Sequence, residues 1–425
     1  MITLGRFFRS RASRKFRKDR MAVVSMAVIG LYVLIGLAGF VGLISIGDAL
    51  ERAGPDSTTG FFQDQTPEKR LRDARFWREI AERALRRENP QAAIREAAFF
   101  ERALAPLPPA EVTTLVREAD GLYNAVADHF DEATEARLMI EELQKQPTPD
   151  PAAIAEQAAA REKAQAAAAA ALTELERVTL RLFPIPDGWR GTLYHFRTFL
   201  GTDRQGRSIS MRGLYSVRIA LQVGLVVGLV SLTIGALLGA AAAFFGGWVD
   251  HAVTWLYSTF SSIPELVLLS LIAYVFQGWN FVDELIPVYA ALSLTFWIGP
   301  CRVIRGEVMK IRELEYVQAA TAIGFRRWYI MLRHVLPNTA HLMLITFSLL
   351  FIAAVKAEVI LTFLGLGVKN GASWGIMIGQ SRQEVINGFL WQIGVATVLM
   401  FFLVLAFNIL TDALQDAFDP KHVGK

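Results

Sequence analysis

The sequence lacks most of what an enzyme or a disulfide-stapled domain needs. Its 425 residues include one cysteine, Cys301, which excludes an intrachain disulfide and a cysteine-based metal site. The phosphate-binding pattern Gly-x4-Gly-Lys-Ser/Thr is missing, so we do not expect the chain to hydrolyse ATP itself. His-Glu-x-x-His, Gly-x-Ser-x-Gly and a Cys–His pair are missing too, and His129 and His195 lack metal-ligand spacing. We therefore predict no catalytic, cofactor-binding or metal site.

A strong charge of either sign is also missing. The net charge of +4 does not suggest a nucleic-acid binder. Hydrophobic residues make up 53% of the chain, which is too apolar for an average soluble protein. Because 20% of the residues are nevertheless charged, we expect a polar domain beside a membrane-embedded part.

The N-terminal residues 1–20 carry eight Lys or Arg and one acid, and residues 21–46 are then apolar. This run is longer than the roughly 7–15 residues of a secretory signal core. It is better interpreted as a first transmembrane helix, with a basic tail held in the cytoplasm by its positive charge.

Residues 47–195 differ in character and are predicted to form a helical insertion outside the cytoplasm. They are rich in Ala, Glu and Arg, with proline clusters at 106–109 and 147–151. Helix propensity favours two to four helices in a hairpin or small bundle. A spacer or lid without chemistry is the favoured interpretation of this segment.

Five further apolar runs follow in residues 196–425, the predicted transmembrane core. They are residues 219–245, 254–277 (interrupted at Pro264-Glu265), 285–303, 340–365 and 389–410. With the first helix they give six spans of the length that a bilayer requires. The fold class is therefore an all-α membrane protein with six transmembrane helices and a helical insertion after the first.

Alternation from a cytoplasmic N-terminus places residues 304–338 and the C-terminal tail in the cytoplasm. The basic residues in and beside that loop agree with the positive-inside rule. They are Arg302, Arg305, Lys310, Arg312, Arg326, Arg327 and Arg333.

Two features inside the spans have structural as well as functional interpretations. Gly224-x3-Gly228 and Gly235-x3-Gly239 favour close packing between helices. Lys356 and Glu358 are charges within a span, and charges in a membrane usually face a cavity or a partner. Pairing with a neighbouring helix and a role on the substrate path stay open for them.

The loop 304–338 is a polar segment between two of the long apolar runs. Residues 315–323 favour a short helix, Gly324 a turn, and 325–334 a second helix with Trp328 and two arginines. Pro337 suits the first turn of the next membrane helix. From these residues alone, two interpretations of the loop are equally supported. It is either a docking site for a separate motor protein or a basic hairpin lying on anionic lipid.

The stretch "EYVQAATAIGFRRWYIMLRHVLPN" (315–338) resembles the EAA loop of ABC importer permeases, in the version of the dipeptide/oligopeptide/nickel family. The matching positions are Glu315, Tyr316, Val317, Ala319, Ala320, Gly324, His334, Leu336, Pro337 and Asn338. Residues 200–221, 357–378 and 414–421 resemble three more blocks of the family, the first that of its C-type subunit.

The resemblance implies the type I ABC importer permease fold and transport by alternating access in a bacterial inner membrane. It implies a homologous second permease, a periplasmic or lipid-anchored binding protein, and two cytoplasmic ATPases that bind ATP and Mg. Short peptides are the favoured substrate, with nickel complexes and oligosaccharides open.

The EAA loop is then implied to be the element that couples the permease to the ATPases. The implied coupling residues are Glu315, Tyr316, Gln318, Ala319, Ala320, Gly324, Phe325, Arg326, Arg327 and Trp328, followed by the loop-to-helix motif His334, Leu336, Pro337 and Asn338. The residues implied to lie on the binding-protein side are Thr202, Asp203, Gly206, Arg207, Gly365, Gly367, Ser373, Trp374 and Gly375.

Three departures from the family pattern stand out. Gln318 occupies a position where an acid is common, and Ser208 one where Asp is common. The insertion 47–195 is much longer than usual for the family. Docking a specialised binding protein, reaching a partner and covering the pore mouth all stay open for it.

Two other classes compete with a permease. A membrane-anchored scaffold or sensor would use 47–195 as its input domain, but only about 15 residues follow the last span as output. A secondary carrier needs ion-binding polar residues in mid-membrane, and these are scarce.

Overall fold

The computed structural model describes residues 19–50, 67–86, 105–145, 150–279, 285–369, 371–386 and 388–418. Most of the predicted basic tail, part of the second proline cluster and the end of the block 414–421 lie outside the described residues. Within them every named element is a helix, and the β pairing is a single bridge between Thr202 and Ser208. The all-α prediction is confirmed.

Five helical runs of the described residues are long and apolar enough to cross a membrane. They are α3 (Arg20–Val41), α10 (Ile209–Phe245), α13 with α14 (Leu285–Ile311), α16 with α17 (Arg327–Phe363), and α19 (Trp391–Phe418). A sixth span results if α11 (Gly247–Ser261) and α12 (Glu265–Gln277) count as one, although they meet at 94°. Pro264 sits at that bend, where it lacks an amide hydrogen and restricts the residue before it.

The chain is organised in two compact units. The membrane unit comprises Met1–Ile46 and Arg212–Lys425, and the insertion unit comprises Gly47–Met211. The insertion unit thus extends past residue 195, where the sequence placed its end. The physical reason is a local tie, because the Ser208 hydroxyl donates to the carbonyl of Arg197 in α9 (Trp189–Thr198).

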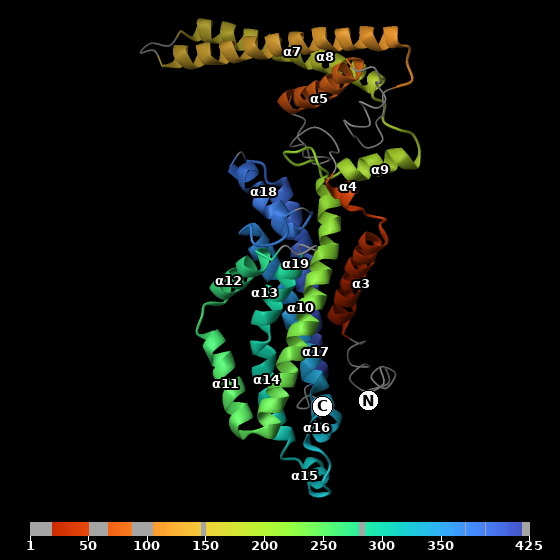
Figure 1. The fold of residues 1–425 in the computed structure, drawn as a ribbon. Helices are drawn as coiled ribbons and strands as arrows, with labels where there is room; N and C mark the ends of the chain where they lie inside the picture. Colours follow the sequence, from red (N-terminus) through yellow and green to blue (C-terminus); the bar gives the residue numbers. More distant parts are fainter. Residues whose placement is uncertain are drawn as a thin grey trace. The chain divides into compact units, whose positions relative to one another are not determined.

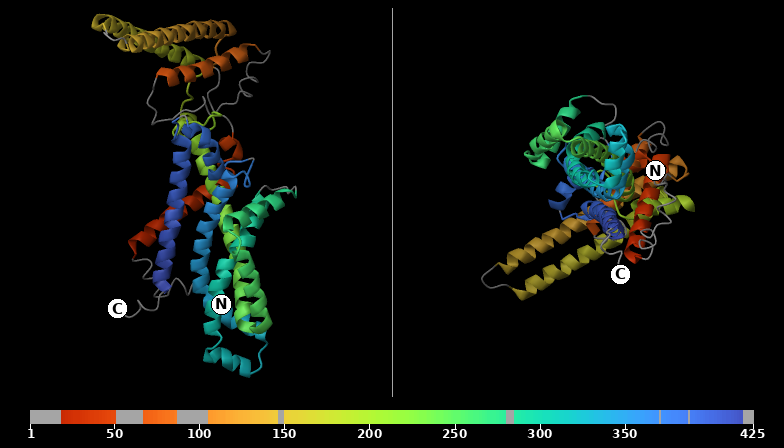
Figure 2. Two further views of the ribbon diagram at one scale, coloured as in Figure 1. Left: turned by 90° about the vertical axis from the view of Figure 1, so that its left-hand side faces the viewer. Right: turned by 90° about the horizontal axis from the view of Figure 1, so that it is seen from below.

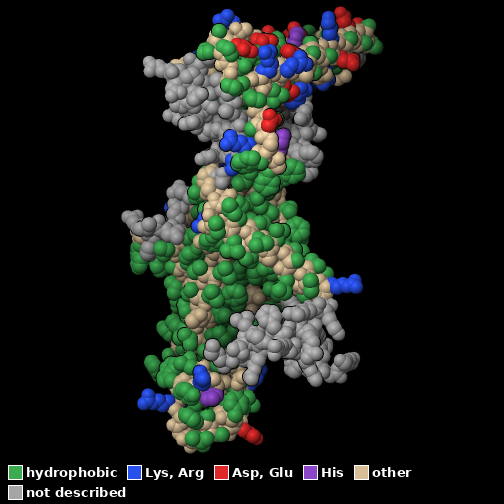
Figure 3. Space-filling model, turned by 90° about the vertical axis from the view of Figure 1, so that its right-hand side faces the viewer, with side chains coloured by type: hydrophobic (Ala, Val, Ile, Leu, Met, Phe, Trp, Pro, Cys, Tyr) green, Lys and Arg blue, Asp and Glu red, His purple; other side chains and the backbone are tan. Residues whose placement is uncertain are grey.

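A long antiparallel hairpin of α7 (Pro109–Gln144) and α8 (Pro151–Leu182) dominates the insertion unit (Figures 1 and 2). Each helix begins with a proline, whose fixed φ suits the first helical position. Asp150 caps α8 by accepting from the amide of Ala152 at 2.9 Å. Acidic and basic side chains gather on this hairpin, whereas apolar side chains cover the visible face of the membrane unit (Figure 3).

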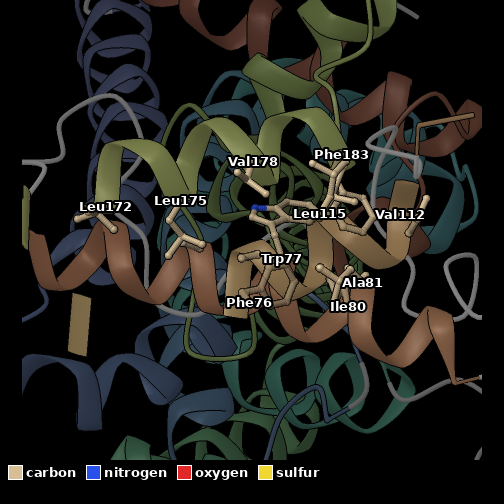
Figure 4. Close-up of a cluster of buried hydrophobic side chains, with 14 of the residues drawn as sticks. Phe76, Trp77, Ile80, Ala81, Val112, Leu115, Leu172, Leu175, Val178 and Phe183 are labelled. Atoms are coloured by element: carbon tan, nitrogen blue, oxygen red, sulfur yellow. The ribbon is translucent and has the colours of Figure 1, made fainter. Parts of the chain in front are cut away.

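Another helix of the insertion unit, α5 (Pro67–Leu85), packs against the base of the hairpin. Trp77 lies at the centre of their shared core, with its ring centroid 5.4 Å from that of Phe183 (Figure 4). Arg70 binds both carboxylate oxygens of Glu176 at 2.7 Å, which raises the pKa of Arg70 and fixes α5 on α8. The insertion is therefore a folded helical unit with a core of its own.

Glycines on α10 let neighbouring helices of the membrane unit approach closely. A Cβ atom on Gly239 would lie 2.4 Å from the carbonyl oxygen of Cys301, and one on Gly235 would lie 2.5 Å from that of Trp297. Backbone atoms of α14 (Ile298–Ile311) and the residue before it therefore occupy the space of the missing side chains. Gly224 and Gly228 instead meet the rings of Phe351 and Phe347. The packing role predicted for both glycine pairs is confirmed.

Candidate functional site

The loop between α14 and α17 (Ala340–Phe363) contains a short helix, α15 (Glu315–Ala322), that ends in a glycine turn. Gly324 has φ of 91°, in the left-handed region that favours glycine. Its amide donates to the carbonyl of Thr321 at 3.0 Å, and that of Phe325 donates to Ala320 at 3.2 Å. These two bonds form a Schellman motif, which stops α15 and reverses the chain. The predicted helix and turn are both present.

One side of the loop is anchored in a hydrophobic core of the membrane unit. Val317, Ile330 and Met331 are buried there with Val335, against Ala240 and Phe244 of α10 and Ile304 and Val308 of α14. Their exposed fractions are 2% or less for the four loop residues. Burial of apolar area on this scale fixes the loop to the ends of two membrane helices.

The opposite side of the loop is apolar and exposed. Ile323 is 75% exposed, Trp328 59% and Phe325 49%. Phe325 stacks on Tyr329 with ring centroids 5.7 Å apart, and Trp328 rests on Phe245 at 4.7 Å. The exposed rim is therefore preorganised by its own contacts and surrounds the Gly324 turn.

Arginines attach this rim to the end of α10. Arg327 donates to the carbonyl of Phe244 at 3.3 Å, and its guanidinium lies 5.4 Å from the centroid of the Phe245 ring. Arg312 donates to the carbonyl of Ala243 at 2.7 Å. Both arginines satisfy carbonyls at the C-terminus of a helix, where positive charge is favoured.

The second predicted helix, 325–334, differs in the structure. Helix α16 (Arg327–Ile330) leads into a π-helical turn (Met331–Val335), a 3-10 turn (Leu336–Thr339) and then α17, as one run. Pro337 explains the irregular turns, because it cannot donate the hydrogen bond that a continuous α-helix requires. It lies inside this run, at the start of its 3-10 turn, and not at the first turn of a separate membrane helix.

The loop-to-helix motif closes the loop on itself. The side-chain amide of Asn338 donates to the hydroxyl of Tyr316 at 2.7 Å and to the carbonyl of His334 at 2.9 Å. Tyr316 near the start of the loop and Asn338 at its end, 22 residues apart in the chain, are thereby joined. Gln318 donates to the carbonyl of Glu313 at 3.1 Å, so its amide has a partner within the loop.

Of the residues expected on the binding-protein side, the first group forms a compact turn in the insertion unit. One carboxylate oxygen of Asp203 accepts from the amides of Gln205 and Arg207, and the other accepts from the Arg207 guanidinium at 2.8 Å. Gly206 has a positive φ of 71°. Thr202 and Asp203 are 1% and 2% exposed, so this pattern specifies the shape of the turn.

The second group begins just after α17 and extends into the first two residues of α18 (Trp374–Ile386) in the membrane unit. Gly365 has φ of 78° and ends α17, and Ser373 accepts from the amide of Ile376 at the start of α18. Trp374 is 1% exposed and donates to the carbonyl of Gly213 at 3.2 Å. These residues therefore determine how the loop folds.

One ion pair between two membrane helices was not predicted from the sequence. Arg305 of α14 binds both carboxylate oxygens of Asp250 in α11, at 2.6 and 2.8 Å. The partners lie 55 residues apart, and no local spacing relates them. Glu358 is 2% exposed while Lys356 is exposed, so these two charges do not share one environment.

The apolar helices and the braced loop define the class of the protein, a multi-pass membrane transport permease. A family model for the binding-protein-dependent transport system inner membrane component matches residues 232–423. The chain belongs to this family and is a C-type permease subunit of an ABC importer.

Similar proteins include three bacterial permeases. The dipeptide transport system permease protein DppC of Bacillus subtilis is 34% identical over 52% of this chain and 68% of its own length. The oligopeptide transport system permease protein OppC of Haemophilus influenzae is 32% identical over 54% and 71%. The peptidoglycan transport system permease protein YejE of Agrobacterium fabrum is 33% identical over 52% and 57%.

Proposed function

We propose that this subunit takes part in ATP-driven import of short peptides. It forms half of the translocation path with a homologous second permease, and a periplasmic or lipid-anchored binding protein delivers the substrate. Peptides are supported by the relatives, which are named for dipeptides, oligopeptides and glutathione. Two partner ATPases bind ATP and Mg and supply the energy.

The coupling site on this chain is the surface formed by Ile323, Phe325, Trp328 and Tyr329 around Gly324. The single observation that carries the assignment is the contrast between its two sides. The inner side is buried in the membrane unit, whereas four large apolar side chains of the outer side are 47–75% exposed. Exposed aromatic residues beside arginines, on a rigid base, are the composition of a protein-binding hot spot.

A lipid-lying hairpin is the second interpretation of this loop. The Tyr316–Asn338 bond and the Schellman turn favour docking over lipid, because they hold the loop as a closed, reversed turn and not as one continuous amphipathic helix. In this arrangement the loop and both termini are cytoplasmic, and the insertion 47–195 lies outside the cytoplasm.

On the outer side, Thr202, Asp203, Gly206 and Arg207 shape a turn whose exposed tip, Arg204-Gln205, meets the binding protein. The loop that carries the exposed Lys369 meets the binding protein in the same way. Its shape is set by Gly365, Gly367, Ser373, Trp374 and Gly375. The insertion acts as a spacer with no chemistry of its own.

Substitution at the tip of the coupling surface tests the proposal. Ile323→Asp places a charge on a side chain that is 75% exposed, so the fold is retained while the contact is lost. We expect loss of ATPase co-purification and of peptide uptake. The matched control is Ile386→Asp at the far end of the membrane unit, which is 74% exposed. Co-purification that survives Ile323→Asp, or fails equally in both variants, contradicts the assignment.

A further inference from the structure

Glu358 is a carboxylic side chain buried in the membrane unit with no part in the coupling surface. It lies on α17, is 2% exposed, and accepts from the hydroxyl of Thr362 at 2.8 Å. A buried carboxyl group is costly unless its hydrogen bonds are satisfied. Its partners therefore show what the group holds together.

The hydroxyl of Ser373, which lies beyond the end of α17, is beside the Glu358 carboxyl group. The same Ser373 oxygen accepts from the amide of Ile376 at 3.2 Å. Because a hydroxyl has one proton to donate and lone pairs to accept, Ser373 keeps its proton for the carboxyl group while it accepts from Ile376. Glu358 is thereby placed next to the residue that immediately precedes α18.

Thr362 forms the third point of the cluster. Its hydroxyl oxygen accepts from the amide of Val368 at 3.3 Å. A Cβ atom on Gly367 would lie 1.9 Å from that oxygen, and one on Gly375 would lie 2.6 Å from the Thr362 Cβ. The two glycines thus allow the loop and α18 to close on Thr362. We call Glu358, Thr362 and Ser373 the carboxyl latch.

The coupling loop lies at the other end of the same helical run. Residues Arg327–Phe363 form one run of 37 residues, which starts in the coupling surface and contains two latch residues in its last two turns (Figure 1). Its irregular turns near Pro337 are braced by the Asn338 bonds to Tyr316 and His334. A continuous run braced in this way is the kind of element that can carry a displacement from one end to the other.

We propose that Glu358 is a positioning residue that fastens α18 and the glycine loop to α17, so that movement of the coupling loop reaches the opposite side of the permease. The role rests on the proposed coupling function. Without the carboxyl group, the buried Thr362 hydroxyl loses its acceptor and the loop is released from α17. The ATPases then still turn over, but their motion no longer moves α18.

The ratio of peptide transported to ATP hydrolysed in the reconstituted importer tests the latch. Glu358→Leu is expected to lower this ratio about tenfold, which corresponds to one lost buried hydrogen bond. Glu358→Gln is expected to keep it, because the amide oxygen still accepts from the Thr362 hydroxyl. Lys356→Gln, an exposed change two residues away, is the matched control. If transport and ATP hydrolysis fall together in Glu358→Leu, or neither falls, the latch is refuted.

A local measurement separates failure of the latch from failure of the proposed function. A spin label at Leu364→Cys, in a Cys301→Ser background, reports the mobility of the loop in the purified complex without transport. Leu364 is 54% exposed, so the label is tolerated. We expect a more mobile label with Glu358→Leu or Thr362→Val and an unchanged one with Glu358→Gln. An immobile label in both apolar variants overturns the latch, even if transport itself is shown to use another route.

Discussion

At the scale of single residues, the backbone conformation of Gly324 leads us to a prediction about coupling. Its φ of 91° is unfavourable for residues with a Cβ, although no atom lies within 4 Å of the place a Cβ would take. The cost of Gly324→Val is therefore purely conformational, about 1–3 kcal/mol. We expect uptake and ATPase binding to fall, while Gly324→Asn retains most of both because Asn tolerates this region.

Gly306→Val is the control, since Gly306 has open space and no positive φ. Equal uptake in the Val and Asn variants at position 324 contradicts a conformational role for this glycine. Thermal stability of the purified subunit, measured beside uptake, shows whether the turn or the whole fold has been affected.

Residue identity predicted some of these details and not others. The glycine turn followed from one residue, because only glycine occupies this conformation cheaply. The hydrogen-bond partner of Gln318 did not follow from the sequence, since a side-chain amide can bind many groups. The carbonyl of Glu313 is available to it because α14 ends before that residue. The burial of Asp203 was also unforeseen, although Asp-x-x-Gly is a recurrent turn pattern.

At the scale of elements, the contact between α10 and α14 depends on glycine. The Gly239 Cβ position lies 2.4 Å from a backbone oxygen, which cannot rotate away as a side chain does. Gly239→Ala should therefore push the two helices apart and destabilise the subunit by about 1–3 kcal/mol. We expect a lower melting temperature in detergent and reduced yield in the membrane.

Gly394→Ala on α19 is the matched change, because nothing lies within 4 Å of its Cβ position. Gly228→Ala is expected to fall between the two, as it meets only the Phe347 ring at 2.9 Å. The same melting temperature for the Gly239 and Gly394 variants would remove the argument for close backbone packing.

Element boundaries were predictable where one residue decides them and not where tertiary contacts do. The bend at Pro264 was visible in the sequence, since proline interrupts a helix locally. The start of α10 at Ile209, ten residues before the predicted span, was not. Residues 209–218 include two arginines, and Arg212 is buried with its guanidinium donating to Gln380 at 2.7 Å. Only the tertiary fold supplies that partner.

At the scale of the whole molecule, hydropathy predicted the helical class and the spans, because a bilayer demands long apolar helices. Hydropathy predicted less about how the helices of the insertion pack, because their alanine-rich sequences show only weak hydrophobic periodicity. The core around Trp77 joins three helices across more than 100 residues of sequence, and such pairings do not follow from local pattern. The Asp250–Arg305 pair was missed for the same reason.

The last prediction concerns the membrane topology of the whole chain. Cys301 is the sole cysteine and is buried, so a Cys301→Ser background accepts single reporter cysteines without interference. Glu141→Cys lies on the hairpin, where the Glu141 side chain is 52% exposed, and Ile323→Cys lies on the coupling surface. If positive charge holds the loop in the cytoplasm, a membrane-impermeant maleimide added to spheroplasts reaches only the hairpin cysteine. Permeabilised membranes should then label both positions, which controls for reactivity. Labelling of position 323 in intact spheroplasts would show that the orientation is opposite to the proposed one. Protection of position 141 would place the insertion in the cytoplasm.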